Sequence, residues 1–88
     1  MKSKVKLIDR NGRPSPLFDC ETYADGSEFE LDAETSHEYV KTARILLVMK
    51  GDQVVDEFNV LGYSFYGDTI VSDSHALRNG NYIVSVSV

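Results

Sequence analysis

The stretch from Asp19 to Glu34, DCETYADGSEFELDAE, predicts a tight β-hairpin around which the rest of the chain can be interpreted. Asp25-Gly26 is a favoured two-residue type I′ turn, because both central positions of that turn require a positive φ. Pairing outward from the turn sets Glu21 directly opposite Glu30. Because side chains alternate across a strand, this register predicts one apolar and one acidic face.

The two predicted faces differ sharply in chemistry. The apolar face would hold Phe18, Cys20, Thr22, Phe29, Leu31 and Ala33. The acidic face would hold Asp19, Glu21, Tyr23, Glu28, Glu30, Asp32 and Glu34. Like charges directly opposite each other cost roughly 0.2–1 kcal/mol per pair. We therefore expect either a neighbouring strand or a basic partner to offset the acidic face, and we take its seven residues as the candidate partner-binding site.

Length and composition predict one globular domain over residues 1–88, with 42% hydrophobic and 26% charged residues. The single cysteine, Cys20, excludes an internal disulfide framework and favours a reducing compartment. The chain has no signal-peptide pattern and no run near the ~18 apolar residues of a membrane span. We expect a cytoplasmic protein without a membrane partner.

Charge is distributed unevenly along the chain. The net charge is −5, yet residues 1–13 carry five basic groups against one acid, Asp9. Residues 19–38 contain eight acids and no base. Such a surface repels nucleic acid and favours basic protein partners.

Lys4–Asp9 predicts a first strand, with Val5 and Leu7 on one side. Its other side carries a basic stripe formed by Lys2, Lys4 and Lys6. If this strand lies beside the acidic hairpin, each lysine neutralises a neighbouring acid. If it lies elsewhere, the carboxylates stay available to a partner.

A second hairpin is predicted over residues 43–61, with Gly51-Asp52 as a type II′ turn. The implied register gives an apolar core face of paired residues, namely Met49 with Val54, Leu47 with Asp56, Ile45 with Phe58 and Ala43 with Val60. Asp56 is the exception, since a carboxylate on a core face needs a partner or an exposed location.

The remaining segments carry weaker signals. Residues 35–43 fit either a short helix, with Thr35 and Glu38 as a capping box, or an extended strand. Gly67-Asp68 predicts a further hairpin, residues 73–78 a loop, and residues 79–81 a turn before a closing strand. In that strand Tyr82, Val84 and Val86 share one face.

These short strands and turns predict an all-β fold, either a small antiparallel β-sandwich or a small barrel built from hairpins. The closing hairpin and the Asn79-Gly80-Asn81-Tyr82 strand form a pattern that resembles bacterial immunoglobulin-like and fibronectin-like modules. The resemblance implies a sandwich, although such cores often contain a tryptophan and this chain has none.

No motif predicts an enzyme, a cofactor or a metal site. Cys20 with His37 or His75 could form a catalytic pair, but the hairpin register turns Cys20 into the core. Asp73-Ser74-His75 fits a turn better than a triad. The carboxylates lack the wrapped loop of a calcium site, and the glycines form no phosphate-binding pattern. Three lysines on an acidic protein are a weak footprint for direct nucleic-acid binding.

The favoured hypothesis is a non-enzymatic module whose acidic hairpin engages a basic protein. A sharper form is nucleic-acid mimicry, because carboxylates about 6.6–7 Å apart along a strand match the roughly 6–7 Å separation of successive phosphates. In size and charge alone the chain resembles phage-encoded inhibitors of host restriction or CRISPR machinery. The alternative is a structural subunit or decoration module of a larger assembly, such as a virion, that packs through strand edges or Tyr63–Tyr66.

Overall fold

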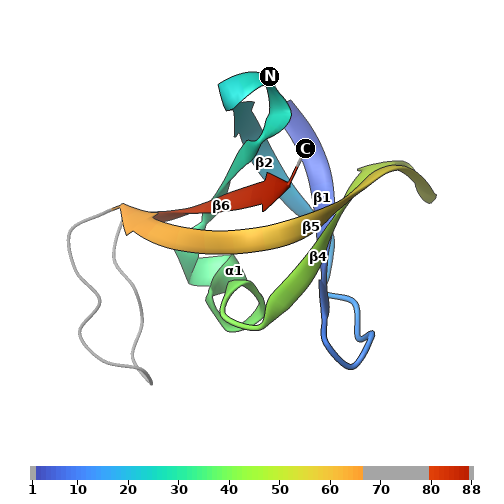
Figure 1. Ribbon diagram of the computed structural model, residues 1–88, viewed down its shortest axis with the longest axis horizontal. Helices are drawn as coiled ribbons and strands as arrows, with labels where there is room; N and C mark the ends of the chain where they lie inside the picture. The colour runs from blue at the N-terminus through green and yellow to red at the C-terminus, as the bar shows by residue number, and fades with distance from the viewer. Residues whose placement is uncertain (1, 67–79, 88) are drawn as a thin grey trace.

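Six antiparallel strands close into a barrel in this computed structural model, which describes residues 2–66 and 80–87 (Figure 1). The elements are β1 (Lys2–Asp9), β2 (Phe18–Tyr23), the 3₁₀ turn η1 (Ala24–Gly26), β3 (Glu28–Asp32), α1 (Ala33–Val40), β4 (Ala43–Lys50), β5 (Gln53–Tyr66) and β6 (Asn81–Ser87). The strand order is β1-β2-β3-β6-β5-β4, and β4 pairs with β1 to complete the ring. Of the two predicted architectures, the structure therefore shows the barrel and not the sandwich.

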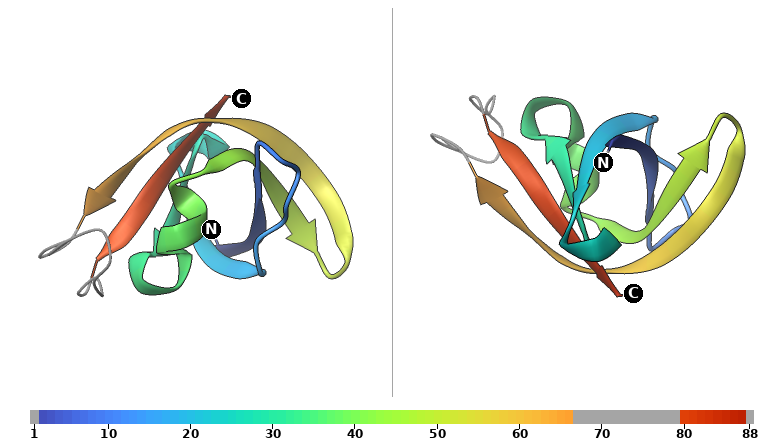
Figure 2. Two further views of the ribbon diagram at one scale, coloured as in Figure 1. Left: turned by 90° about the horizontal axis from the view of Figure 1, so that it is seen from below. Right: turned by 90° about the horizontal axis from the view of Figure 1, so that it is seen from above.

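Two three-stranded meanders make up the barrel, and α1 carries the chain from the first to the second. The first contains β1, β2 and β3, and the second contains β4, β5 and β6. In Figure 2, β5 curves around the barrel as one long strand. Its first half pairs with β4 and its second half with β6. This change of pairing partner along β5 determines where a pocket forms at one end of the barrel.

The interior is filled by alternate residues of each strand, as period-2 patterning requires. The faces predicted for the first strand, for the acidic hairpin as far as Asp32 and for the last strand as far as Val86 are confirmed. The buried apolar residues are Val5, Leu7, Phe18, Cys20, Phe29, Leu31, Ala33, Val40, Leu46, Tyr82, Val84 and Val86. Cys20 is a free thiol in this core.

The hairpin between β2 and β3 has the predicted register, but its turn is longer than the predicted two residues, because Tyr23 with Glu28 is the last strand pair and Ala24 also has a positive φ, of 52°. Glu21 pairs with Glu30, and the chain reverses at Asp25 and Gly26, whose φ values are 57° and 93°. The Ser27 backbone N–H donates to the Ala24 carbonyl across the turn. Both central φ values are positive, as the type I′ prediction required.

The predicted core face of the β4–β5 hairpin is wrong in the middle of β4 and confirmed at Ala43, Phe58 and Val60, which pack against the core. The hairpin begins in the predicted register, with Lys50 opposite Gln53, but a β-bulge then places Val48 opposite Asp56. The bulge shifts the pairing by one residue, so Leu46 and Val48 face the core in place of Ile45, Leu47 and Met49. Leu46 is consequently buried and faces Phe58.

Asp56, which the sequence placed on the core face, is exposed in the structure. It lies in the outer part of the β4–β5 hairpin, where the turn extends away from the barrel (Figure 1). Gly51 has a φ of 60° at the first central position of that turn, as the type II′ prediction requires. The carboxylate of Asp56 thus remains in water and needs no buried partner.

The ambiguous segment is a helix, but it begins and ends earlier than predicted. Helix α1 covers Ala33–Val40, and its N-cap is Asp32 and not Thr35. The Asp32 carboxylate accepts the backbone N–H of Glu34 at 2.8 Å and that of Thr35 at 3.4 Å. Asp32 thereby satisfies helix N–H groups that have no intrahelical acceptor.

Helix α1 packs against β1, β3 and β6. Within residues 2–66 and 80–87, no helix is long and apolar enough to cross a membrane. The predicted turn at Gly67-Asp68 and the predicted loop over residues 73–78 lie outside the described residues.

Candidate functional site

Five of the seven predicted site residues share the outer face of β2 and β3. They are Asp19, Glu21, Tyr23, Glu28 and Glu30, which alternate with buried core residues. Asp32 ends β3 and caps α1, and Glu34 belongs to the helix and is exposed. The predicted extension of the acidic face along one strand through Glu34 is therefore wrong, because the helix starts at Ala33.

The strand that carries the lysines is a direct neighbour of β2. Lys2 lies opposite Glu21 and Lys4 lies opposite Asp19. The Lys4 ammonium donates to the Asp19 carboxylate at 2.6 Å. This hydrogen bond and the charges of Lys4 and Lys2 hold the pKa of Asp19 below its ordinary value. The two β2 acids thus meet basic residues from within the chain.

The acids of β3 have different surroundings. β3 lies between β2 and β6, and neither of those strands contains a lysine or arginine. Since neighbouring strands are about 4.8 Å apart, the β1 lysines stand roughly two strand spacings from β3. Glu28 and Glu30 therefore keep their charge without a basic neighbour on either adjacent strand.

Glu30 is held in place from both sides by neutral donors. The Tyr23 hydroxyl donates to its Oε1 at 2.9 Å, and the Asn81 Nδ2 donates to its Oε2 at 2.7 Å. The carboxylate raises the pKa of Tyr23, mainly because the hydrogen bond stabilises the neutral phenol. Both donors orient the Glu30 carboxylate and leave its negative charge intact.

A shallow hollow lies where these acids and the lysines meet. It has a volume of about 560 Å³ and is lined by Lys2, Lys4, Asp19, Cys20, Glu21, Glu30 and Asn81. The hollow is mixed in charge, with the basic groups at the β1 side. The acidic surface that stays free of lysine is therefore centred on β3 and not on the whole predicted face.

Among the described residues, Cys20 and His37 do not form the catalytic pair considered from the sequence. Cys20 is buried, and burial raises the pKa of its thiol to about 11, which disfavours a nucleophilic thiolate at neutral pH. The His37 Nδ1 is hydrogen-bonded to the Tyr82 hydroxyl at 2.6 Å. His75 and the Asp73-Ser74-His75 segment lie outside the described residues. Among the described residues, no group of three or more His, Cys, Asp or Glu side chains is arranged to hold a metal ion.

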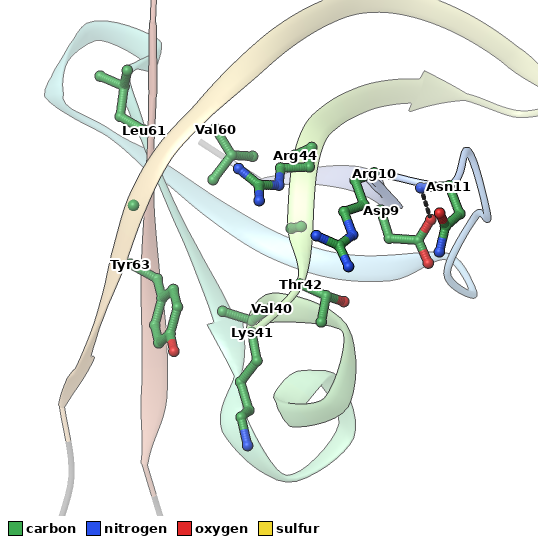
Figure 3. A pocket seen from close by; sticks show the side chains of 12 residues that line it. Asp9, Arg10, Asn11, Val40, Lys41, Thr42, Arg44, Val60, Leu61 and Tyr63 are labelled. Carbon is green, nitrogen blue, oxygen red and sulfur yellow. Dashed lines mark hydrogen bonds between the residues drawn. The ribbon is translucent and has the colours of Figure 1, made fainter.

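A second pocket, at one end of the barrel, was not predicted from the sequence. It has a volume of about 490 Å³, and three of its lining residues are basic: Arg10, Lys41 and Arg44. Figure 3 shows Arg44 extending from β4 toward Val60, with Lys41 where the helix ends. In the sequence these cations form no recognisable motif. Only the fold brings them together in one pocket. We call it the basic pocket.

The basic pocket forms because β4 and β5 separate at this end. Their pairing stops at Ile45 with Asn59. Beyond that point β5 pairs only with β6, while the start of β4 pairs with β1 through Ala43 and Asp9. The two strands diverge, and the space between them opens toward α1.

Comparison of the chain with models of protein families, with curated proteins and with solved structures finds no match.

Proposed function

We propose that the protein is a non-enzymatic binding module that engages a basic surface of another protein through the acids of β3. The observation that carries the proposal is the environment of Glu30. Its two oxygens are oriented by Tyr23 and Asn81, and the strands on both sides of β3 contribute no cation. A carboxylate that is fixed but not neutralised loses little conformational entropy when a cation binds it.

Glu28 and Glu30 give this surface its length. They alternate along β3 and are spaced about 6.6–7 Å apart, while Asp32, the next outward residue of the strand, caps α1. This spacing supports the sharper proposal of nucleic-acid mimicry over two successive phosphates. The lysines beside Asp19 and Glu21 limit the mimicking surface to β3 and its immediate surroundings.

Affinity capture from a native host lysate, at low and at high salt, tests the proposal. We expect the wild-type protein to retain a nucleic-acid-processing protein at low salt and to lose it at high salt, because exposed charge pairs are screened. Duplex DNA should displace the captured protein. The double variant Glu28→Gln/Glu30→Gln should lose it, while Asp32 stays unaltered because it caps α1.

The matched control is Asp52→Asn/Glu57→Gln, which removes the same charge from the β4–β5 hairpin, where both residues are exposed. This control should bind like the wild type. Binding that is unchanged in the Glu28→Gln/Glu30→Gln variant would contradict the proposal. Equal losses in both double variants would show that net charge, and not the β3 surface, is responsible.

The second candidate function is structural, with copies of the chain packing together in a larger assembly. Within the described part of the chain, β5 pairs with β4 over residues 53–59 and with β6 over residues 59–66, so each half of β5 keeps one edge that no described strand pairs and that a second copy could use. What also supports this candidate is exposed apolar surface: Leu61 and Tyr66 are 71% and 63% exposed. A concentration-dependent oligomer that persists at high salt and is lost in Leu61→Ser/Tyr66→Ser would favour it over the acidic surface.

A further inference from the structure

The basic pocket has a charge opposite to that of the whole protein. Three cations against the single carboxylate of Asp9 leave a local net charge of +2, while the chain as a whole carries −5. Asp9 is already engaged, because its Oδ1 accepts the backbone N–H groups of Asn11 at 2.8 Å and Arg13 at 2.9 Å. The carboxylate is thus oriented by the turn after β1.

The three cations have no partners among the residues that the structure describes. No ion pair or side-chain hydrogen bond joins Arg10, Lys41 or Arg44 to any of those residues. Lys41 has a local role, since it is the C-cap of α1 and a positive charge is favourable beside the last helix carbonyls. Arg10 and Arg44 have no such role, so their donors are free for a ligand.

Two irregularities in the strands shape the pocket. The β1–β4 register shifts between Ile8 and Asp9, which leaves Arg44 as the extra residue. The β5–β6 register shifts between Val60 and Gly62, which leaves Leu61 as the extra residue. Bulges turn side chains away from the regular alternation and are frequent beside functional sites. Here both extra residues line the same pocket.

Apolar residues and one aromatic ring also line the basic pocket. Val40 and Val60 line it together with Tyr63, which is 47% exposed. The Tyr63 ring packs edge-on against the buried Tyr82, with 5.5 Å between ring centroids. This contact steadies the ring, and its exposed part stays available for stacking. In Figure 3 the Tyr63 side chain extends from β5, and Val40 lies at the end of the helix.

We propose that the basic pocket binds a small organic phosphate with a planar ring, the chemical class of a nucleotide. Arg44 and Arg10 supply planar donor groups that suit phosphate oxygens. The Lys41 side chain points away from both guanidinium groups in Figure 3, so it adds positive charge at the rim of the pocket and no direct contact. Tyr63 and Val60 provide a surface for the ring, with the buried Val40 behind them. The pocket volume of about 490 Å³ lies within the range of small-molecule sites. This site is independent of the β3 surface and of the protein-binding function proposed for it.

Titration of the ¹⁵N-labelled protein with adenosine 5′-monophosphate, followed by backbone amide chemical shifts, tests the proposal. We expect saturable shifts at Arg10, Lys41, Arg44 and Tyr63. Ribose 5-phosphate and adenosine should each bind at least about tenfold more weakly, because each provides only one of the two contacts. Higher salt should weaken the binding of both phosphates and leave that of adenosine unchanged.

Arg44→Gln and Arg13→Gln form the matched pair of variants, since both remove one exposed arginine charge and only Arg44 lines the pocket. Arg44→Gln should weaken nucleotide binding at least about tenfold, and Arg13→Gln less than about twofold. Tyr63→Leu should weaken the nucleotide but not ribose 5-phosphate. Dispersed amide spectra establish that each variant is folded.

Three outcomes would overturn the proposal. The first is the absence of saturable shifts at millimolar nucleotide. The second is an equal loss of binding in Arg44→Gln and Arg13→Gln. The third is a set of shifts at the pocket that appears when the protein alone is concentrated and vanishes in Arg44→Gln, because the pocket would then receive the acidic surface of a second copy.

Discussion

The acidic β2–β3 surface and the basic pocket are opposite in charge and also differ in how their charges are satisfied. On the acidic surface, Asp19 is paired with Lys4 and Glu30 accepts two hydrogen bonds. In the pocket, Arg10 and Arg44 have no such partner among the described residues. The acidic cluster, which is the more conspicuous one in the sequence, is therefore the one whose charges have more partners in the fold.

This difference shows that a run of like charges is a poor measure of binding capacity. A charge contributes to recognition when its position is fixed and its compensation is incomplete. By that criterion the acidic surface narrows to β3, where Glu28 and Glu30 have no basic neighbour on the adjacent strands. The pocket meets the second half of the criterion, because its two arginines are uncompensated by any described residue, and a ligand would have to fix their positions.

The largest expected effect tests the β4 face on which the position of Arg44 depends. Leu46→Ala should lower the free energy of unfolding by roughly 2–5 kcal/mol, because Leu46 is fully buried. Leu47→Ala should cost about 1 kcal/mol or less, since Leu47 lies on the outer side of the barrel opposite Lys6 and Glu57. Urea denaturation of both variants measures the two values. The reverse order would restore the register predicted from the sequence and point Arg44 away from the pocket.

The next effect separates structural acids from those available to a partner. Asp32→Ala should lower the free energy of unfolding by about 1 kcal/mol, within a usual range of roughly 0.5–2, because the helix N-cap is lost. Glu34→Ala, a matched loss of one carboxylate in the first turn, should cost only a few tenths of a kcal/mol. Thermal and urea unfolding provide the comparison. Equal effects would mean that Asp32 contributes only its charge, and it would then rejoin the binding surface.

A smaller effect compares the two regions directly. In phosphate-free buffer, Arg44→Gln should raise the free energy of unfolding slightly, because the pocket gathers like charges. Lys4→Gln should lower it, since Lys4 is paired with Asp19. Urea midpoints at low ionic strength should therefore move in opposite directions. Shifts of the same sign would remove the distinction between the paired and unpaired regions.

The sequence predicts the first meander better than the second for a physical reason. The β2–β3 register follows from the Asp25-Gly26 turn, which constrains both strands locally. The β4–β5 turn was equally clear, but Val48, Val55 and their neighbours are apolar on both faces, so the alternation could not reveal a bulge. Barrel closure was also hidden, because pairing of β1 with β4 joins residues that no local signal connects.

The candidate sites divide in the same way. The acidic face could be predicted because its residues alternate along two adjacent strands. The neutral donor Asn81 could not, since it reaches Glu30 from a strand distant in the sequence. The basic pocket was missed because the divergence of β4 from β5 creates it, and divergence leaves no pattern in the residues themselves.

The smallest effect concerns pH and the pair formed by Lys4 and Asp19. The pKa of Asp19 is lower in the folded protein than its ordinary value of 3.8, first because of the hydrogen bond from Lys4 and then because of its charge. The unfolded chain therefore binds the proton more readily. The stabilisation from this pair is complete above the unfolded pKa and is lost as the pH falls through the folded pKa.

Because both side chains are largely exposed, at 55% for Lys4 and 85% for Asp19, the effect is small and decreases with salt. Urea midpoints measured downward from about pH 5 should fall more steeply in the wild type than in Asp19→Asn. Parallel profiles would show that the contact does not persist in solution, and Asp19 would then count with Glu28 and Glu30 as an acid open to a basic partner.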